Sequence, residues 1–228
     1  MQTLLLLHGA IGASSQLSVL AKSLSSNYIV HTPDFSGHGG KPADRPFSIE
    51  LFAGDVLRFM EQQQLERVSV FGYSMGGYVG MYLAKNYPGK IEKVITLATK
   101  YHWDEAIAAK EILMLNPAKI EQKLPAFAAT LAERHAPNDW KDMLNKTAEM
   151  MVALGNNNTL KIDDYTTIAT PALILLGDRD KMVSLDETVA VYKALPGAQM
   201  GVLPGTPHPI EQVDTALLHF MITGFLID

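Results

Sequence analysis

The stretch that decides the fold runs from Val68 to Gly80 and reads VSVFGYSMGGYVG. It begins with the apolar run 68–71, turns at Gly72 and Gly76, and continues with apolar residues at helical spacing. Because glycine has no side chain, a strand and a helix can approach each other closely across such a turn. The pattern predicts a serine, Ser74, held clear of a sheet at a helix N-terminus, where free N–H groups favour developing negative charge. A plain Gly-Ser loop is the alternative, and the flanking strand and helix patterns favour the catalytic interpretation.

The composition bounds the kind of protein. The chain has 228 residues, of which 47% are hydrophobic, so it can bury a substantial core. A net charge of -5 gives no electrostatic reason to bind nucleic acid or an anionic membrane. The absence of cysteine excludes disulfides, cysteine nucleophiles and thiolate metal sites, and it fits a reducing compartment. With no signal-peptide pattern at the start and no apolar stretch near the roughly 20 residues of a membrane span, we expect a cytoplasmic protein.

Strand and helix patterns alternate along most of the chain. Uninterrupted apolar runs predict strands that are buried on both faces, as in a parallel sheet. Strands are expected at 3–7, 28–31, 68–71, 91–98, 171–176 and 199–203. Helical spacing lies between them at 16–24, 49–63 and 187–195, and again from about 213. The predicted fold is α/β, a doubly wound and mostly parallel sheet of about six strands with right-handed crossovers.

The pattern changes between residues 100 and 164. Three helices are expected there, at 101–115, 120–134 and 138–154, with Pro125 kinking or splitting the second. No strand pattern intervenes, so we expect an all-helical insertion that forms a lid over the carboxyl ends of the strands. The predicted division is a core of residues 1–99 and 165–228 and a lid of residues 100–164.

A serine hydroxyl needs a base, and the base needs an acid to orient it. His208 is the favoured base because it follows the last predicted strand, and the carboxyl ends of parallel strands meet at one edge of a sheet. A turn or capping histidine is the alternative. Asp180 is the favoured acid, whereas Asp178 is interpreted as a turn residue bonded to its own backbone. Asp34 follows another strand and is expected to brace the site.

The other histidines have structural interpretations. His8 and His38 lie in glycine-rich loops, and the remaining four are expected to be packing or surface residues: His31, His102, His135 and His219. Their spacing lacks the i, i+4 or carboxylate-paired pattern of a metal cage, so no metal and no cofactor are expected.

Five motifs in order resemble the α/β-hydrolase family along the whole sheet. They are His8-Gly9, Asp34-x-x-Gly37-His38-Gly39, Gly72-Tyr-Ser74-Met-Gly76, Gly177-x-x-Asp180 and His208. The order Ser, Asp, His also matches the one described for that fold. The resemblance implies that the N–H groups of Ala10 and Met75 form an oxyanion hole. Family members usually have further strands before the His-Gly strand, so the sheet here is expected to be short at that edge.

The chemistry follows from the serine. Relatives that act as dehalogenases or epoxide hydrolases carry an aspartate at this position, whereas a serine supports acyl transfer to water. The leading hypothesis is a serine hydrolase that cleaves carboxylic esters of small to medium acyl groups, with a small ester-like molecule as its partner. The first alternative is a C–C bond hydrolase of a diketone acid or a related lyase-like enzyme. The alternative from another class is a non-catalytic relative that uses the pocket to bind a small molecule.

Two residue types in the predicted lid bear on the substrate. The methionines are interpreted as packing within the lid, or alternatively as a flexible apolar wall for an acyl group: Met114, Met143, Met150 and Met151. The basic residues are interpreted as solvated faces, so they indicate no anionic substrate: Lys110, Lys119, Lys123, Arg134, Lys141 and Lys146.

Overall fold

A computed structural model describes residues 1–227 and contains one six-stranded sheet in which every pairing is parallel. Its strand order is β2-β1-β3-β4-β5-β6, so the chain begins in the interior of the sheet and winds outward in both directions. The strands are β1 (Thr3–Leu7), β2 (Ile29–His31), β3 (Val68–Tyr73), β4 (Ile91–Leu97), β5 (Ala172–Gly177) and β6 (Gln199–Leu203). The predicted fold class and the predicted number of strands are confirmed.

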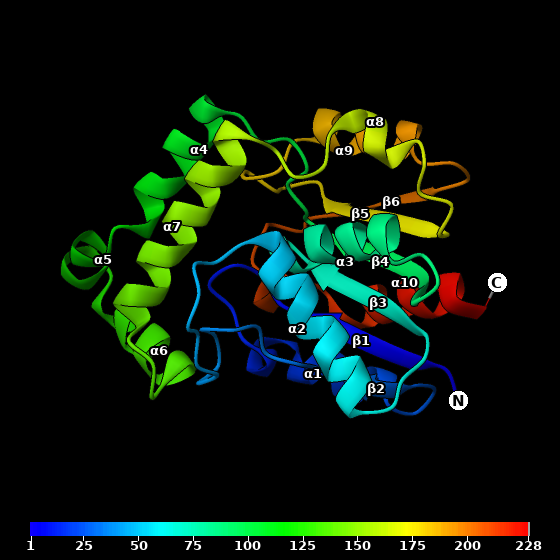
Figure 1. Cartoon of the computed structure of the whole chain (residues 1–228), viewed down its shortest axis with the longest axis horizontal. Helices are drawn as coiled ribbons and strands as arrows, with labels where there is room; N and C mark the ends of the chain where they lie inside the picture. Colours follow the sequence, from blue (N-terminus) through cyan, green and yellow to red (C-terminus); the bar gives the residue numbers. More distant parts are fainter. Residues whose placement is uncertain (228) are drawn as a thin grey trace.

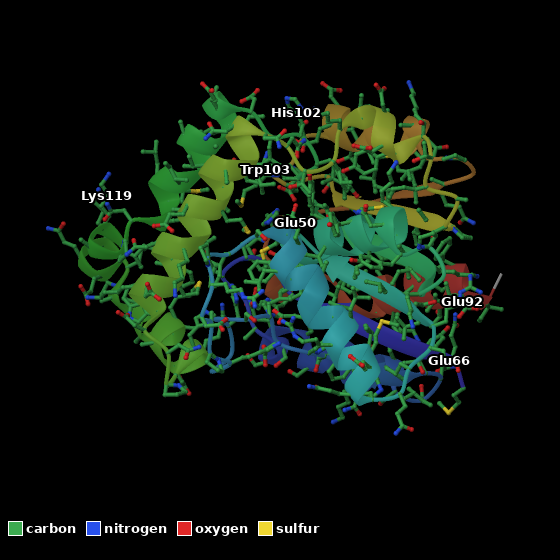
Figure 2. All side chains as sticks on the ribbon, viewed as in Figure 1. Glu50, Glu66, Glu92, His102, Trp103 and Lys119 are labelled. Carbon is green, nitrogen blue, oxygen red and sulfur yellow. The ribbon has the colours of Figure 1, made fainter. Side chains whose placement is uncertain are left out.

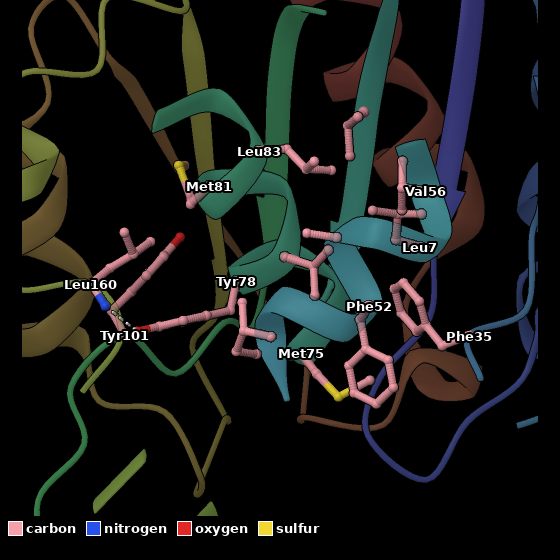
Figure 3. Close-up of a cluster of buried hydrophobic side chains, with 14 of the residues drawn as sticks. Leu7, Phe35, Phe52, Val56, Met75, Tyr78, Met81, Leu83, Tyr101 and Leu160 are labelled. Carbon is pink, nitrogen blue, oxygen red and sulfur yellow. Dashed lines mark hydrogen bonds between the residues drawn. The ribbon is translucent and has the colours of Figure 1, made fainter. Parts of the chain in front are cut away.

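Helices cover both faces of the sheet, which explains the uninterrupted apolar runs (Figure 1). In β1, Leu5 and Leu7 face the helices α2, α3 and α9, whereas Leu4 and Leu6 face α1 and α10. Figure 3 shows part of the first core, where α2 and α3 pack over the strands. The flanking helices are α1 (Ser18–Leu24), α2 (Ile49–Gln62), α3 (Met75–Asn86), α8 (Ile162–Tyr165), α9 (Leu185–Ala194) and α10 (Thr215–Ile227).

Four of the five α-helices between β4 and β5 form a separate group beside the sheet, drawn in green to yellow-green in Figure 1. They are α4 (Glu105–Glu111), α5 (Pro117–Lys123), α6 (Pro125–His135) and α7 (Trp140–Asn156). α7 contacts α4, α5 and α6, so it is the central helix of the group. The division of the chain into a core and a lid stays a prediction, and we call this group the lid helices. Three single-turn 3₁₀ segments complete the elements: Ser14–Leu17, Ile112–Leu115 and Ile210–Gln212.

The helix boundaries differ from the predicted ones where a capping residue or a proline acts. The first lid helix begins at Glu105 rather than 101, because the Asp104 carboxylate caps it by accepting from the Ile107 N–H at 2.7 Å. The second predicted helix is split at Leu124, and Pro125 begins α6. Proline is favoured in the first turn of a helix because its missing N–H would have no partner there.

The carboxyl ends of the strands lie toward the lid helices, and the amino ends lie away from them (Figure 1). In Figure 2, Trp103 marks the lid side, whereas Glu66 and Glu92 mark the opposite end of the sheet. The loops that follow β1, β3, β5 and β6 therefore open at one edge, and these loops carry the predicted site residues.

Candidate active site

Ser74 occupies a one-residue connection between β3 and α3. Its backbone has φ +51° and ψ −118°, a region that is unfavourable for a residue with a side chain. The connection is this sharp because two glycines allow the backbones to touch. A Cβ on Gly72 would lie 2.3 Å from the Gly76 carbonyl oxygen, and one on Gly76 would lie 2.3 Å from the Leu7 carbonyl oxygen. The sequence therefore produces the predicted turn, with the serine at its tip.

The Ser74 side chain is half-buried and lies at the N-terminus of the twelve-residue helix α3. Among residues 1–227, no group hydrogen-bonds to its hydroxyl. Its carbonyl oxygen, by contrast, accepts from the N–H groups of Gly77 and Tyr78 and from the Thr99 hydroxyl. The backbone of Ser74 is thus fixed on several sides while its hydroxyl stays available.

His208 and Asp180 are brought together across 28 residues of sequence. The ring Nδ1 of His208 lies 2.8 Å from Asp180 Oδ2, and the two side chains are 13% and 1% exposed. The other carboxylate oxygen, Oδ1, accepts from the N–H groups of Met182 at 2.8 Å and Val183 at 2.9 Å. Both carboxylate oxygens are therefore occupied, and the imidazole is held by its Nδ1 with Nε2 on the opposite side of the ring.

The environment of Asp180 favours the ionised carboxylate. Burial by itself would raise the pKa of Asp180, because a charge is costly in a poorly solvated position. The hydrogen bond and the charge of His208, together with the two backbone N–H donors, outweigh this cost and lower the pKa below its ordinary value. The carboxylate can therefore compensate a positive charge on the imidazole.

His208 is also placed next to the nucleophile turn. The Tyr73 hydroxyl donates to the His208 carbonyl oxygen at 3.1 Å, and the two rings lie 5.6 Å apart between centroids. Tyr73 directly precedes Ser74, so the loop that carries His208 contacts the end of the strand that leads to the serine. The structure shows the Asp180–His208 contact, but no hydrogen bond joins His208 to Ser74 among the residues described.

Asp178 does not act as the predicted turn residue. Its Oδ1 accepts from the Thr206 N–H at 3.1 Å, and Thr206 lies 28 residues along the chain. The side chain thus ties the end of β5 to the loop that carries His208. The interpretation as a bond to its own backbone was wrong, because the β6 loop comes closer than the local backbone does.

The oxyanion hole that the family resemblance implies stays a prediction, and the structure shows the surroundings of its two N–H groups. Met75 is the first residue of α3, so its N–H lies outside the helical hydrogen-bond ladder. The Ala10 N–H, in the loop after β1, has no hydrogen-bond partner among residues 1–227. Ala10, Ser74 and Met75 all line one small cavity.

The Ala10 loop is braced by buried polar groups. The Asp34 carboxylate accepts from the Ser14 N–H at 2.7 Å and from the Ser14 hydroxyl at 2.8 Å. His38 Nε2 lies 2.7 Å from the Ala10 carbonyl oxygen, and His8 Nε2 accepts from the Phe35 N–H at 3.2 Å. Both histidines are fully buried, in agreement with the structural roles predicted for them.

The cavity at Ser74 is small, about 40 Å³. Its wall comes from the sheet domain and from α7, with apolar side chains except for Ser74, the Tyr78 hydroxyl and one lysine. The lining residues are Ala10, Ile49, Ser74, Met75, Tyr78, Lys100, Trp103, Met150, Met151 and Leu154. Of the four lid methionines, Met150 and Met151 thus line the cavity, whereas Met143 is buried and Met114 is exposed.

A larger cavity of about 400 Å³ lies at the base of the lid helices, between α4, α8 and α9. None of the predicted catalytic residues lines it. Tyr78 lines the smaller cavity, and its partners Asn158 and Leu160 line the larger one. The Tyr78 hydroxyl donates to Asn158 Oδ1 at 2.5 Å. It also accepts from the Leu160 N–H at 2.8 Å (Figure 3). Ser74, Ala10 and Met75 line the smaller cavity, whereas His208 and Asp180 line neither of the two, so the smaller cavity is the candidate active site because it contains the serine.

Sequence reasoning missed two basic residues. The sequence pattern places Arg134 on a solvated face, but its side chain is 12% exposed and contacts the loop after β1 and the segment after His208. It donates to the Ile11 carbonyl oxygen at 3.2 Å and pairs with Glu211 at 3.5 Å. Lys100 was given no role, yet it lines the cavity at Ser74. No local sequence pattern indicates that Arg134 is buried or that Lys100 lines the cavity, because the residues they contact lie far away in sequence.

The described residues contain neither a candidate metal site nor a candidate membrane-spanning helix. No cluster of three or more His, Cys, Asp or Glu side chains is arranged to hold a metal ion in residues 1–227. Over the same range, no helix combines the length and apolar character needed to cross a bilayer.

Comparison with known proteins identifies the fold family. A family model described as the alpha/beta hydrolase fold matches residues 2–210. The 2-(acetamidomethylene)succinate hydrolase of Mesorhizobium japonicum is 24% identical, with 98% of this chain and 87% of that protein aligned. The esterase YbfF of Escherichia coli K12 is 28% identical over 54% of this chain and 51% of its own.

Solved structures show the same fold. The enol-lactonase of Burkholderia xenovorans superposes with a TM-score of 0.78 at 20% identity, covering 100% of this chain and 92% of that one. The match of the family model to most of the chain, with the strand order and the turn at Ser74, leads to one conclusion. The chain belongs to the alpha/beta hydrolase fold family.

Proposed function

We propose that this protein hydrolyses carboxylic esters of small to medium acyl groups, with Ser74 as the nucleophile, His208 as the base and Asp180 as the orienting acid. The observation that carries the proposal is the Asp180–His208 hydrogen bond of 2.8 Å, in a loop that contacts the residue before Ser74. A buried acid that holds an imidazole by Nδ1 fixes the tautomer in which Nε2 can accept a proton. The orientation of the imidazole by the carboxylate is what a base for a serine hydroxyl needs.

The proposed reaction has two halves. In the first, the Ser74 hydroxyl attacks the ester carbonyl while its proton passes to His208 Nε2, and the N–H groups of Ala10 and Met75 stabilise the oxyanion. Collapse of this intermediate expels the alcohol, which takes the proton from His208, and leaves an acyl group on Ser74. In the second half, His208 activates a water that hydrolyses the acyl-enzyme and restores Ser74. Each donor to the oxyanion is worth about 3 kcal/mol of transition-state stabilisation.

The test is hydrolysis of p-nitrophenyl acetate, propionate and butyrate by the wild type and by Ser74→Ala. We expect the substitution to lower kcat by about 10³-fold or more, because the acyl-enzyme can no longer form. Ser26→Ala, in the exposed turn before β2, is the matched control and should leave the rate unchanged. Equal rates for wild type and Ser74→Ala would contradict the proposal.

Two alternatives are distinguished by adding two measurements. A panel that includes a vinylogous diketone acid tests C–C bond hydrolysis, for which the ester rates would be far below the diketone rate. A fluorophosphonate probe tests the non-catalytic alternative, because only an activated serine reacts with it. Labelling that disappears in Ser74→Ala supports a hydrolase, whereas a chain that binds ligands without labelling is a binding protein.

A further inference from the structure

One charged side chain belongs to the wall of the catalytic cavity and has no part in the proposed reaction. Lys100 follows β4 by three residues, and its side chain is 13% exposed. It lines the cavity together with Ser74, Ala10 and Met75, and most of the remaining wall is apolar. An ammonium in such a position loses much of its hydration, so it needs compensation from charges or hydrogen bonds.

Two carboxylates lie near the Lys100 ammonium, but neither forms a hydrogen bond with it. Lys100 Nζ lies 3.6 Å from Glu187 Oε2 and 3.9 Å from Glu111 Oε1, and both distances exceed a hydrogen bond. Among residues 1–227, the ammonium donates to no acceptor within hydrogen-bond distance. Its three N–H donors therefore have no protein acceptor among the residues that the structure describes.

Of the two glutamates, Glu187 is held away from the lysine by other hydrogen bonds. Glu187 Oε1 accepts from the Tyr101 N–H at 3.1 Å, and its Oε2 accepts from the Ser184 N–H at 3.2 Å. Glu111 is 5% exposed, and its Oε2 has no hydrogen-bond partner. The two carboxylates balance the positive charge of Lys100 without hydrogen-bonding to it, and Lys100 is among the residues that line the Ser74 cavity.

The charge balance selects the kind of group that fits. One ammonium and two carboxylates carry a net charge of −1, so a substrate carboxylate would bring a third negative charge to a poorly solvated cluster. A neutral oxygen adds no charge and still accepts a hydrogen bond from the ammonium. Such hydrogen bonds to a charged donor are stronger than those between neutral groups.

The cavity volume limits the length of the group. Roughly 10–15 Å³ of such volume holds one water molecule, so about 40 Å³ holds about three or four non-hydrogen atoms. The side chains that set this limit are Trp103, Met150, Met151 and Leu154, all of which lie in the helical segment after β4.

From these observations we propose that Lys100 is a specificity-determining residue. It selects short acyl groups that carry a neutral oxygen, as a hydroxyl, ether or keto group, over alkyl groups of the same size. The proposal rests on the proposed function at Ser74 and names the substrate class of that site.

The test uses two esters with acyl groups of equal length, p-nitrophenyl methoxyacetate and p-nitrophenyl butyrate. Lys100→Met removes the donors and keeps the length of the side chain, and Lys110→Met, an exposed lysine of α4, is the control. We expect Lys100→Met to lower kcat/KM for the methoxyacetate about 10- to 100-fold and to change that for the butyrate less than about threefold. The difference in intrinsic reactivity of the two esters cancels, because each ester is compared with itself.

Two outcomes would overturn the proposal. Equal losses for the two esters would show that Lys100 supports the site without reading the acyl group. A loss confined to mono-p-nitrophenyl malonate, added as a third ester, would show that the lysine recognises a carboxylate.

A binding experiment separates failure of this proposal from failure of the proposed function. The ketones methoxyacetone and 2-pentanone have the same size and are not hydrolysed, and their affinity for the wild type is measured by NMR titration. We expect methoxyacetone to bind about tenfold more tightly than 2-pentanone, even in Ser74→Ala. Equal affinities of the two ketones would overturn the role of Lys100 without the use of any Lys100 variant. Absence of fluorophosphonate labelling in the wild type would contradict only the proposed role of Ser74.

Discussion

At the scale of single residues, Asp180 divides its two oxygens between two tasks. Oδ1 accepts from the backbone of Met182 and Val183, which fixes the carboxylate, and Oδ2 contacts His208. An asparagine at this position would keep its oxygen toward the two N–H donors and turn its amino group toward the imidazole. His208 Nδ1 would then have to accept, so the proton would reside on Nε2 and the ring could not serve as a base.

We therefore expect Asp180→Asn to lower kcat for ester hydrolysis by about 10³- to 10⁴-fold with little effect on folding. Stopped assays of p-nitrophenyl butyrate hydrolysis measure the rate, and circular dichroism checks the fold. Asp178→Asn is the matched control, since its amide oxygen can still accept from the Thr206 N–H. If Asp178→Asn lost activity and Asp180→Asn kept it, the orienting acid would be the other carboxylate.

The sequence was sufficient to predict which residues follow the strands of one parallel sheet, whereas their catalytic roles stay a prediction. Ser74, Asp180 and His208 each lie in such a loop, so a parallel sheet is enough to bring them to one edge. Lys100 also follows a strand, but its significance depends on Glu111 and Glu187, which only the packing of α4 and α9 brings near it. A lysine after a strand has no signature of its own.

At the scale of elements, the end of α6 links the lid helices to the loop that carries Ala10 and to the loop that carries His208. Arg134 contacts the Ile11 carbonyl oxygen beside Ala10 and pairs with Glu211, three residues after His208. His135 Nε2 lies 3.2 Å from the same Ile11 oxygen, and Gln16 also donates to Glu211. The end of α6 thus fixes the position of the loop that carries Ala10 relative to the loop that carries His208.

Because of this link, we expect Arg134→Gln to lower kcat about tenfold while leaving KM almost unchanged. A hydrogen bond to a charged group contributes about 1.5–3 kcal/mol, and only part of it is expressed in the alignment of the loops. Steady-state kinetics with p-nitrophenyl butyrate provide the two constants. Arg134→Lys should recover part of the rate, and Lys141→Gln, which removes an exposed pair with Glu121, should have no effect. An unchanged kcat in Arg134→Gln would show that the loops hold their positions without α6.

The elements themselves were predictable to different degrees. Strands β1 and β6 begin and end at the predicted residues, and β1 is bounded by the polar residues Gln2 and His8. The 3₁₀ segments and the short helix α8 were not predicted, since a single turn buries too few residues to leave a periodic pattern. Asp104 was a capping signal that the apolar spacing of residues 101–115 obscured.

At the scale of the whole molecule, three buried histidines make the stability depend on pH. Burial and the neighbouring histidine lower the pKa of His8 and of His135, the latter to about 4, and burial lowers the pKa of His38. These side chains are neutral when folded, whereas an unfolded histidine takes up a proton below about pH 6.5. The unfolded state therefore binds more protons below that pH, so acid lowers the free energy of unfolding.

We expect the free energy of unfolding to fall as the pH decreases from about 6.5 to 4, by up to about 1.4 kcal/mol per pH unit for each histidine. Urea unfolding at pH 7.5, 6 and 5 measures this slope. His135→Gln should lower the stability at pH 7.5 and also flatten the slope, whereas His102→Gln, at an exposed position, should not change it. Parallel curves for wild type and His135→Gln would contradict the assignment.

The two ends of the lid segment leave the sheet domain at one point. The Asn158 side chain donates to the Tyr101 carbonyl oxygen at 3.0 Å and accepts from the Tyr78 hydroxyl at 2.5 Å, so the outgoing and returning chains are joined to each other and to α3. Because the two chain segments are joined at this point, the residues between them can be replaced by a longer or shorter segment. Each doubling of the length of that segment costs only about 0.6 kcal/mol of loop-closure entropy. Evolution can thus replace one wall of the cavity, with Met150, Met151 and Leu154, while the groups proposed to break bonds keep their places.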